Sequence, residues 1–147
     1  MSSRINKIFS DNKKKLVTFV TGCDPNFNIS NQIIEKLPSF GSDIIEIGMP
    51  FSDPMADGPT IQLSSSRAIK NGSDLNKIFK ICNNFRKRNN FTPLILMGYY
   101  NVVFHFGIDN FINSCVKNGV DGLIIVDLQP EEDNELLKKM KLKKIDL

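Results

Sequence analysis

The segment that decides the fold is Ile44-Ile-Glu-Ile-Gly-Met-Pro-Phe-Ser-Asp-Pro-Met-Ala-Asp-Gly-Pro-Thr-Ile61. It begins with a run of β-branched residues, which is typical of a buried strand, and passes at Gly48 into a loop stiffened by prolines. A single carboxylate, Glu46, lies inside the apolar run. Because burial disfavours the charged form of a carboxylate, this position predicts a group that gives and takes protons near neutral pH.

The loop carries a second carboxylate, Asp57, eleven positions after Glu46 (57 − 46). One acid on a strand and another on a stiff loop are suited to acid–base chemistry on a bound small molecule. The alternative is structural: Glu46 could pair with a basic side chain inside a core, since buried ion pairs also perturb carboxylates. The residues alone favour the catalytic interpretation without excluding the structural one.

Apolar runs and amphipathic patterns alternate along the chain. Strands are predicted at 16–21, 44–47, 93–97 and 122–126, and residues 145–147 look like the start of another strand. Helices are predicted within 2–14, 29–37, 61–69, 75–85 and 108–116, with Ser73 as a cap and a further helix that begins near Pro130. Strands that are apolar on both faces and alternate with helices indicate a parallel sheet covered by helices.

An internal repeat supports this division of the chain. Residues 41–45 and 119–123 each place a glycine and an aspartate before an apolar strand. Polar side chains also gather where the predicted strands end, at Asp24, Glu46, Tyr99, Asn101 and Asp127. That edge of a parallel sheet holds the active site in both (βα) barrels and doubly wound folds, and the pattern alone does not separate the two.

Composition excludes several classes of function. The chain has 147 residues, 41% hydrophobic and 24% charged, with a net charge of +3, as in an ordinary globular protein. Its lysine clusters carry no interleaved aromatic residues, so no nucleic-acid partner is expected, and no apolar run is long enough for a membrane span. The three cysteines are too far apart for a disulfide framework or a zinc motif, and we expect a reducing, cytoplasmic location.

Residues 46–62 closely resemble the signature of the tryptophan synthase α subunit family, and stretches 18–25, 97–101, 119–127 and 130–132 extend the resemblance in the family's order. The family fold is an eight-stranded (βα)8 TIM barrel. Residues 1–147 would form the N-terminal half of that single domain, with the first four βα units and the start of strand five. A complete barrel needs about 250 residues, so a partial sequence or a true truncation is expected. Half a barrel is not expected to fold stably alone, because its inner face and sheet edges stay uncovered.

The resemblance also implies a reaction. The family is a carbon–carbon lyase of tryptophan biosynthesis that cleaves indole-3-glycerol phosphate to indole and glyceraldehyde 3-phosphate. Glu46 would be the acid–base group, and Asp57 would accept the indole N–H and stabilise the developing positive charge. Phe19 and Tyr99 would line the substrate pocket, and Asp127 would help to orient the loops. A purely structural role stays open for these three residues, and for Phe19 it is packing in the core.

By the same resemblance, the α subunit uses no metal and no organic cofactor of its own. Pyridoxal phosphate belongs to the partner, the tryptophan synthase β subunit, which receives the indole in an α2β2 heterotetramer. The loop around Asp53 and the turn near Gln129 and Pro130 would face this partner. We expect the single histidine, His105, to pack between phenylalanines rather than to act in catalysis, and Ser64 to Ser66 to lie on a helix surface.

Two other functions remain open. The chain could be a catalytically inactive remnant that at most binds the β subunit, because no glycine-rich phosphate loop occurs in these residues. It could also be another sugar-phosphate (βα) barrel enzyme, although the signature at 46–62 argues against that.

Overall fold

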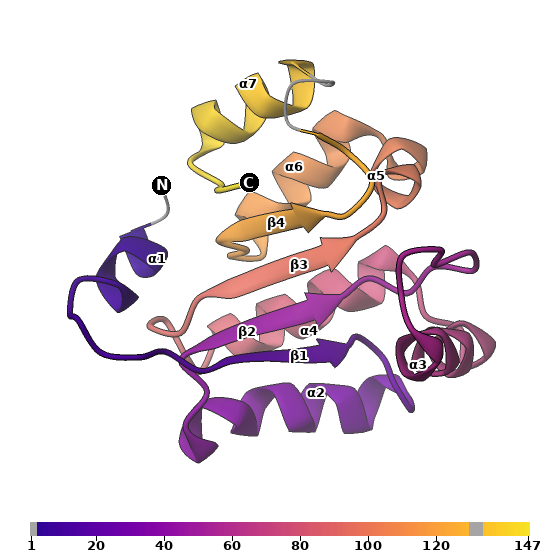
Figure 1. Cartoon of the computed structure of the whole chain (residues 1–147), viewed down its shortest axis with the longest axis horizontal. Coiled ribbons are helices and arrows are strands. Elements are labelled where there is room, and N and C mark those ends of the chain that lie inside the picture. The colour runs from indigo at the N-terminus through magenta and orange to yellow at the C-terminus, as the bar shows by residue number, and fades with distance from the viewer. Residues whose placement is uncertain (1–2, 130–133) are drawn as a thin grey trace.

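A computed structural model describes residues 3–129 and 134–147, and its centre is a four-stranded parallel sheet (Figure 1). The strands lie in sequence order, and their bounds are β1 Val17–Thr21, β2 Ile44–Gly48, β3 Leu94–Gly98 and β4 Gly122–Ile125. The register places Phe19 opposite Glu46, and Glu46 opposite Ile95. Asp146 forms a parallel bridge with Gly122, so the predicted fifth strand begins beside β4.

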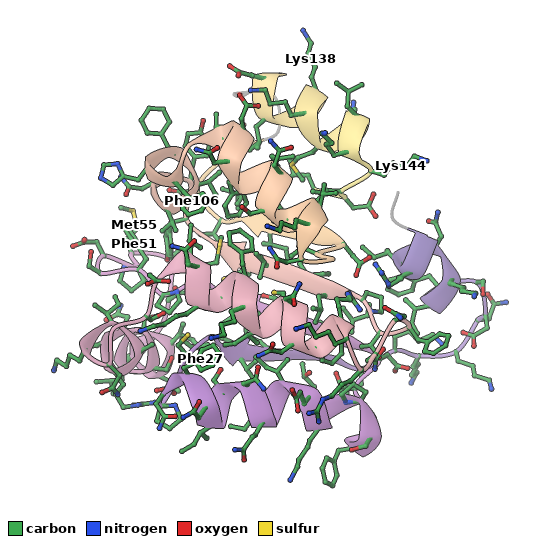
Figure 2. All side chains as sticks on the ribbon, turned by 180° about the vertical axis from the view of Figure 1, so that it is seen from behind. Phe27, Phe51, Met55, Phe106, Lys138 and Lys144 are labelled. Carbon is green, nitrogen blue, oxygen red and sulfur yellow. The ribbon has the colours of Figure 1, made fainter. Side chains whose placement is uncertain are left out.

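Helices connect the strands. Their bounds are α1 Ser3–Ile8, α2 Phe27–Lys36, α3 Pro59–Lys70, α4 Leu75–Arg86, α5 Tyr100–Phe106, α6 Ile108–Lys117 and α7 Asn134–Lys143, with a 3-10 turn η1 at Leu37–Phe40. Helices α2, α4 and α6 cover the same face of the sheet (Figure 1 and Figure 2). None of the described helices is long and apolar enough to cross a membrane.

The topology decides between the two folds that the sequence left open. A doubly wound sheet reverses its strand order and carries helices on both faces. Here the order β1-β2-β3-β4 runs without reversal, and the connecting helices cover one face. The arrangement is therefore that of a (βα) barrel, and the predicted fold class is confirmed for four βα units and the start of a fifth strand.

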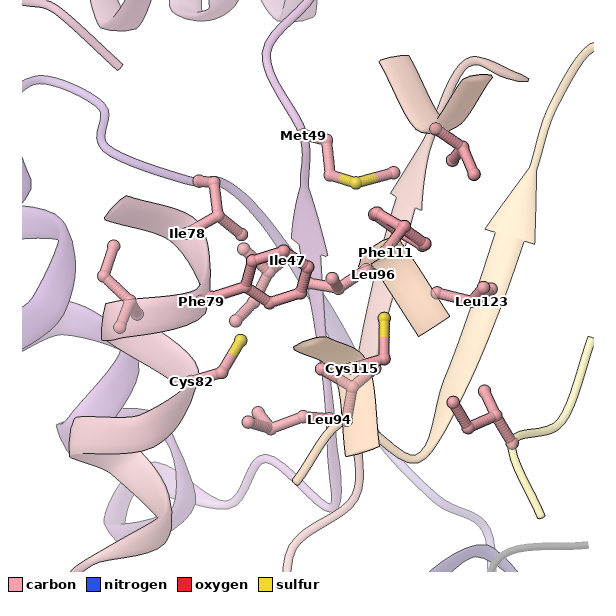
Figure 3. Packing of buried hydrophobic residues seen from close by; sticks show 14 of the residues in the cluster. Ile47, Met49, Ile78, Phe79, Cys82, Leu94, Leu96, Phe111, Cys115 and Leu123 are labelled. Carbon is pink, nitrogen blue, oxygen red and sulfur yellow. The ribbon is translucent and has the colours of Figure 1, made fainter. Parts of the chain in front are cut away.

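The hydrophobic core lies between the sheet and the helices α4 and α6 (Figure 3). Alternate residues of the strands point into it, and the buried set includes Ile45, Ile47, Leu94, Leu96, Leu123 and Ile125. The helices contribute Ile78, Phe79, Cys82, Phe111 and Cys115. Full burial of one such aliphatic side chain contributes roughly 1.5–3 kcal/mol, so this layer fixes the sheet as a platform.

The opposite face of the sheet carries Phe19, Glu46, Ile95, Met97 and Ile124, which are less buried, with Ile124 40% exposed. Among the described elements, α1 reaches this face at the N-terminal ends of the strands. A Cβ atom at Gly122 would lie 3.4 Å from the Ile5 Cδ1 atom, so this helix lies within contact distance of the sheet face. The C-terminal half of the face, where Glu46 lies, is left accessible by the described residues.

Several local predictions need correction. The N-terminal helix ends at Ile8 instead of continuing to residue 14. Helix α4 is capped by Asp74 rather than by Ser73, because the Asp74 carboxylate accepts the Lys77 backbone N–H at 2.8 Å. Helix α5 was not predicted. The helix start expected near Pro130 lies outside the described residues, and α7 is described from Asn134.

Candidate active site

Glu46 occupies the middle of β2 and points to the face that the helices leave accessible. Its side chain is half-buried, and this burial raises the pKa of the Glu46 carboxyl above its ordinary value. No hydrogen bond or ion pair from the described residues reaches the carboxylate. The structure therefore gives no support to the alternative in which Glu46 pairs with a basic side chain inside a core.

Asp57 lies near the end of the loop 49–58, which connects β2 to α3. The Tyr99 hydroxyl donates a hydrogen bond to the Asp57 Oδ2 atom at 3.2 Å. The backbone carbonyl of Asp57 accepts a second bond, from the Gln62 side-chain amide at 2.9 Å. These contacts hold Asp57 at the C-terminal edge of the sheet, the edge where a parallel α/β fold places its site.

Tyr99 follows β3 directly and is only 2% exposed. Its hydroxyl accepts the Ala56 backbone N–H at 2.9 Å, and its ring lies 5.2 Å from the Phe51 ring. Burial raises the pKa of the Tyr99 phenol, and the charges of Asp57 and Asp127 act in the same direction. The predicted pocket residue is thus also a contact of the loop that carries Asp57.

Asp127 lies just after β4 and is exposed. Its Oδ1 atom accepts the backbone N–H of Tyr100 at 2.7 Å, at the first residue of α5. The first N–H groups of a helix have no partner within the helix, and a carboxylate there is favourable. The contact ties the segment after β4 to the start of α5, and the role predicted for Asp127 in orienting the loops stays a prediction.

Phe19 lies beside Glu46 in the neighbouring strand. Its ring crosses Gly48, where an added Cβ atom would come within 2.7 Å of the Phe19 Cζ atom. A glycine at this position therefore lets the ring lie flat against β2.

Two further apolar residues, Met97 and Ile124, align with Gly48 across the sheet and share the face of Glu46. Sequence reasoning missed them, although counting alternate positions from Glu46 across aligned strands would find them.

Two surface grooves flank α3, and neither is lined by Glu46 or Asp57. A groove of about 580 Å³ lies between the loop and α3, and its lining includes Phe51, Pro54 and Leu63. Figure 2 shows Phe51 and Met55 on that loop beside α3. The second groove, of about 310 Å³, lies between β1, α2 and α3, where Arg67 binds both carboxylate oxygens of Asp24.

Two expectations about other polar residues were wrong. His105 is exposed on α5 instead of packed between phenylalanines, and it lies outside the site. Ser64 and Ser65 are buried rather than on a helix surface, because α3 turns its small residues toward the sheet. The Ser64 hydroxyl forms a 2.6 Å hydrogen bond with the hydroxyl of Thr21 in β1. Ser66 is exposed, as predicted.

Comparisons with known proteins agree with this geometry. A family model described as tryptophan synthase alpha chain matches residues 5–147. The chain is similar to the tryptophan synthase subunit alpha of Legionella pneumophila, with 34% identity and a TM-score of 0.92 over 99% of this chain and 56% of that one. It is also similar to a chain of the Pyrococcus furiosus tryptophan synthase α2β2 complex, with 37% identity and a TM-score of 0.81 over 89% of this chain and 53% of that one. A third match is a Mycobacterium tuberculosis tryptophan synthase structure, at 28% identity and TM-score 0.91, over 98% and 60% of the two chains. The chain thus spans little more than half the length of these relatives.

Proposed function

The chain belongs to the tryptophan synthase alpha chain family, a family of lyases, and from this premise we propose that its accessible sheet face takes part in the cleavage of indole-3-glycerol phosphate to indole and glyceraldehyde 3-phosphate. The observation that carries the proposal is Glu46: a half-buried carboxyl with a raised pKa and no bonding partner among the described residues. An unpaired acid on a rigid strand is placed to exchange protons with a ligand.

In the proposed step, Glu46 serves as the acid–base group. Cleavage of the carbon–carbon bond requires that C3 of the indole ring gain a proton and that a glycerol hydroxyl lose one. Burial favours the protonated carboxyl, so Glu46 can hold a proton closer to neutral pH than an exposed glutamate does. Its strand fixes the position of the carboxyl, which proton transfer requires.

Asp57 has a different task in the proposal. Protonation at C3 places positive charge on the indole ring, and a carboxylate that accepts the ring N–H stabilises this charge. The Asp57 Oδ2 atom already accepts a hydrogen bond from the Tyr99 hydroxyl. A carboxylate offers about four lone-pair sites, so Asp57 retains capacity to accept the indole N–H. Phe19, Met97 and Ile124 supply the apolar surface for the indole ring, and the buried Tyr99 supports the loop that carries Asp57.

We also propose that the protein works with a β subunit that carries the pyridoxal phosphate and takes the indole, as in an α2β2 complex, with no metal or cofactor of its own and in the cytoplasm. The family and the α2β2 assembly of the similar Pyrococcus furiosus protein support the partner. Loop residue Met55, 85% exposed, and the neighbouring groove at Phe51 offer an apolar surface on the loop predicted to face that partner. The turn at Gln129 is exposed, and Pro130 lies outside the described residues.

The test uses the protein purified from the cells that express it, with its β subunit added. Its intact mass is measured first, because residues 1–147 account for 16.6 kDa. Indole release from indole-3-glycerol phosphate is then compared between the unaltered protein, Glu46→Gln and Asp57→Asn. We expect both variants to lose roughly 10²-fold or more in kcat. Retained indole release in both variants would overturn the mechanism, and no release from the unaltered protein would favour an inactive chain that only binds the partner.

A further inference from the structure

The side chain of Tyr99 touches the loop 49–58 near both of its ends. Its hydroxyl accepts the Ala56 N–H at 2.9 Å and donates to the Asp57 carboxylate at 3.2 Å. Its ring lies 5.2 Å from the ring of Phe51, at the start of the loop. A buried phenol that both accepts and donates toward adjacent residues has a fixed orientation, because rotation of the hydroxyl would break the bond to Asp57.

Tyr99 itself is held on the sheet. It follows Gly98, whose carbonyl accepts the Val126 N–H at 3.0 Å, and it precedes Tyr100, whose N–H is bound by Asp127 at 2.7 Å. The Met49 N–H donates to the Met97 carbonyl at 2.7 Å, but the backbone bonds farther along the loop are local, such as that from the Asp57 N–H to the Pro54 carbonyl at 3.0 Å. The loop residues Ser52, Asp53, Met55 and Ala56 are exposed. The phenol therefore joins an exposed connecting loop to the hydrogen-bonded end of β3.

We propose that Tyr99 is a positioning residue for Asp57: its hydroxyl fixes both the loop and one oxygen of the carboxylate, so that the other oxygen faces the substrate. This inference rests on the proposed function of Asp57. A phenol has a single proton, and here that proton goes to Asp57. The hydroxyl has no second proton to donate to substrate, and the ring is buried against Phe51, so Tyr99 acts on the site through the loop.

The first test is hydrogen exchange of the loop in Tyr99→Phe. This variant keeps the ring against Phe51 and removes the acceptor of the Ala56 N–H. We expect the Ala56 amide to exchange roughly 3- to 10-fold faster, while amides of β2 such as Ile47 keep their rates. Tyr100→Phe is the matched control, because it removes a neighbouring hydroxyl and leaves the Ala56 rate unchanged. Equal Ala56 rates in the unaltered protein and Tyr99→Phe would overturn the anchoring role.

The second test is a double-mutant cycle on indole release with the β subunit present. If the hydroxyl acts through Asp57, Tyr99→Phe lowers kcat by roughly 10-fold and changes KM by less than about twofold. In a protein that already carries Asp57→Asn, Tyr99→Phe then lowers kcat no further. Additive losses in the double variant would mean that the hydroxyl acts on its own, and would overturn the proposal. Full activity of Asp57→Asn would instead defeat the proposed function of Asp57, while the exchange of Ala56 would still report on the anchor.

Discussion

Two carboxylates of the same sheet, one just before β4 at the N-terminal edge and one in the middle of β2, show how differently one functional group can be used. Asp121, at the N-terminal edge, has a side chain only 1% exposed, and it binds Arg86 at 2.5 Å and Arg4 at 2.7 Å. It also accepts the backbone N–H of Leu94 at 2.9 Å. Glu46 is half-buried in the middle of β2 and has no such partner among the described residues.

The difference reflects the two tasks of a (βα) barrel. Arg86 donates further bonds to the carbonyls of Gly119 and Thr92, both at 2.7 Å, so the buried charges at the N-terminal edge are satisfied. Burial lowers the pKa of Arg86 to about 10, which still leaves it charged at neutral pH. A satisfied network holds the fold, whereas an unsatisfied acid is available to a ligand. If the proposed function holds, the stabilising network and the reacting acid occupy different positions along the strands.

The largest effect should come from Asp121→Ala. This change leaves two arginines without their shared carboxylate, and one of them is buried, so we expect a loss of about 3–5 kcal/mol in the free energy of unfolding. Glu46→Gln breaks no ion pair among the described residues and should change the free energy of unfolding by less than about 1 kcal/mol. Urea titrations of both variants, in the protein purified from the cells that express it, measure the contrast. Similar losses in the two variants would contradict the division between a stabilising and a catalytic edge.

A smaller effect is expected at the position that repeats Asp121. Asp43 follows Gly41 as Asp121 follows Gly119, and both glycines have positive φ, 98° and 73°. Asp43 accepts the N–H of Leu16 at 2.8 Å, as Asp121 accepts that of Leu94. Within residues 3–129 and 134–147, no arginine binds the Asp43 carboxylate.

We therefore predict that Asp43→Ala lowers the free energy of unfolding by only about 1 kcal/mol, the contribution of one hydrogen bond. The same urea titration measures it beside Asp121→Ala. The difference between the two variants isolates what the arginines add to a shared backbone contact. A loss at Asp43 as large as that at Asp121 would show that the backbone bond, rather than the ion pairs, sets the stability of the N-terminal edge.

Much of this arrangement could be predicted from the sequence because it follows local patterns. The strands, the glycine turns of the repeat and the unusual position of Glu46 all arise from neighbouring residues. The Tyr99 contact with Asp57 spans 42 residues, and the Arg86 contact with Asp121 spans 35, so neither follows from local pattern. Helix α5 was missed for the same reason. Its valines and aromatic residues have modest helix propensity, and its first N–H is satisfied by Asp127 from another segment.

The smallest expected effect is the part of the pH dependence of the unfolding free energy that the Glu46 carboxyl contributes. Its pKa is raised in the folded protein, so the folded state binds the proton more tightly than the unfolded chain does. The stability that this proton contributes is fully present below the ordinary pKa of 4.5 and is lost as pH rises through the folded pKa. Glu46→Gln cannot titrate, so the variant should gain stability relative to the unaltered protein as pH rises from about 4 to 7. Unfolding titrations of the unaltered protein and Glu46→Gln at several pH values measure this difference. The difference in unfolding free energy between the two proteins could instead stay constant with pH or change in the opposite direction. Either result would show that Glu46 has a charge partner in solution, and the contrast with Asp121 would be lost.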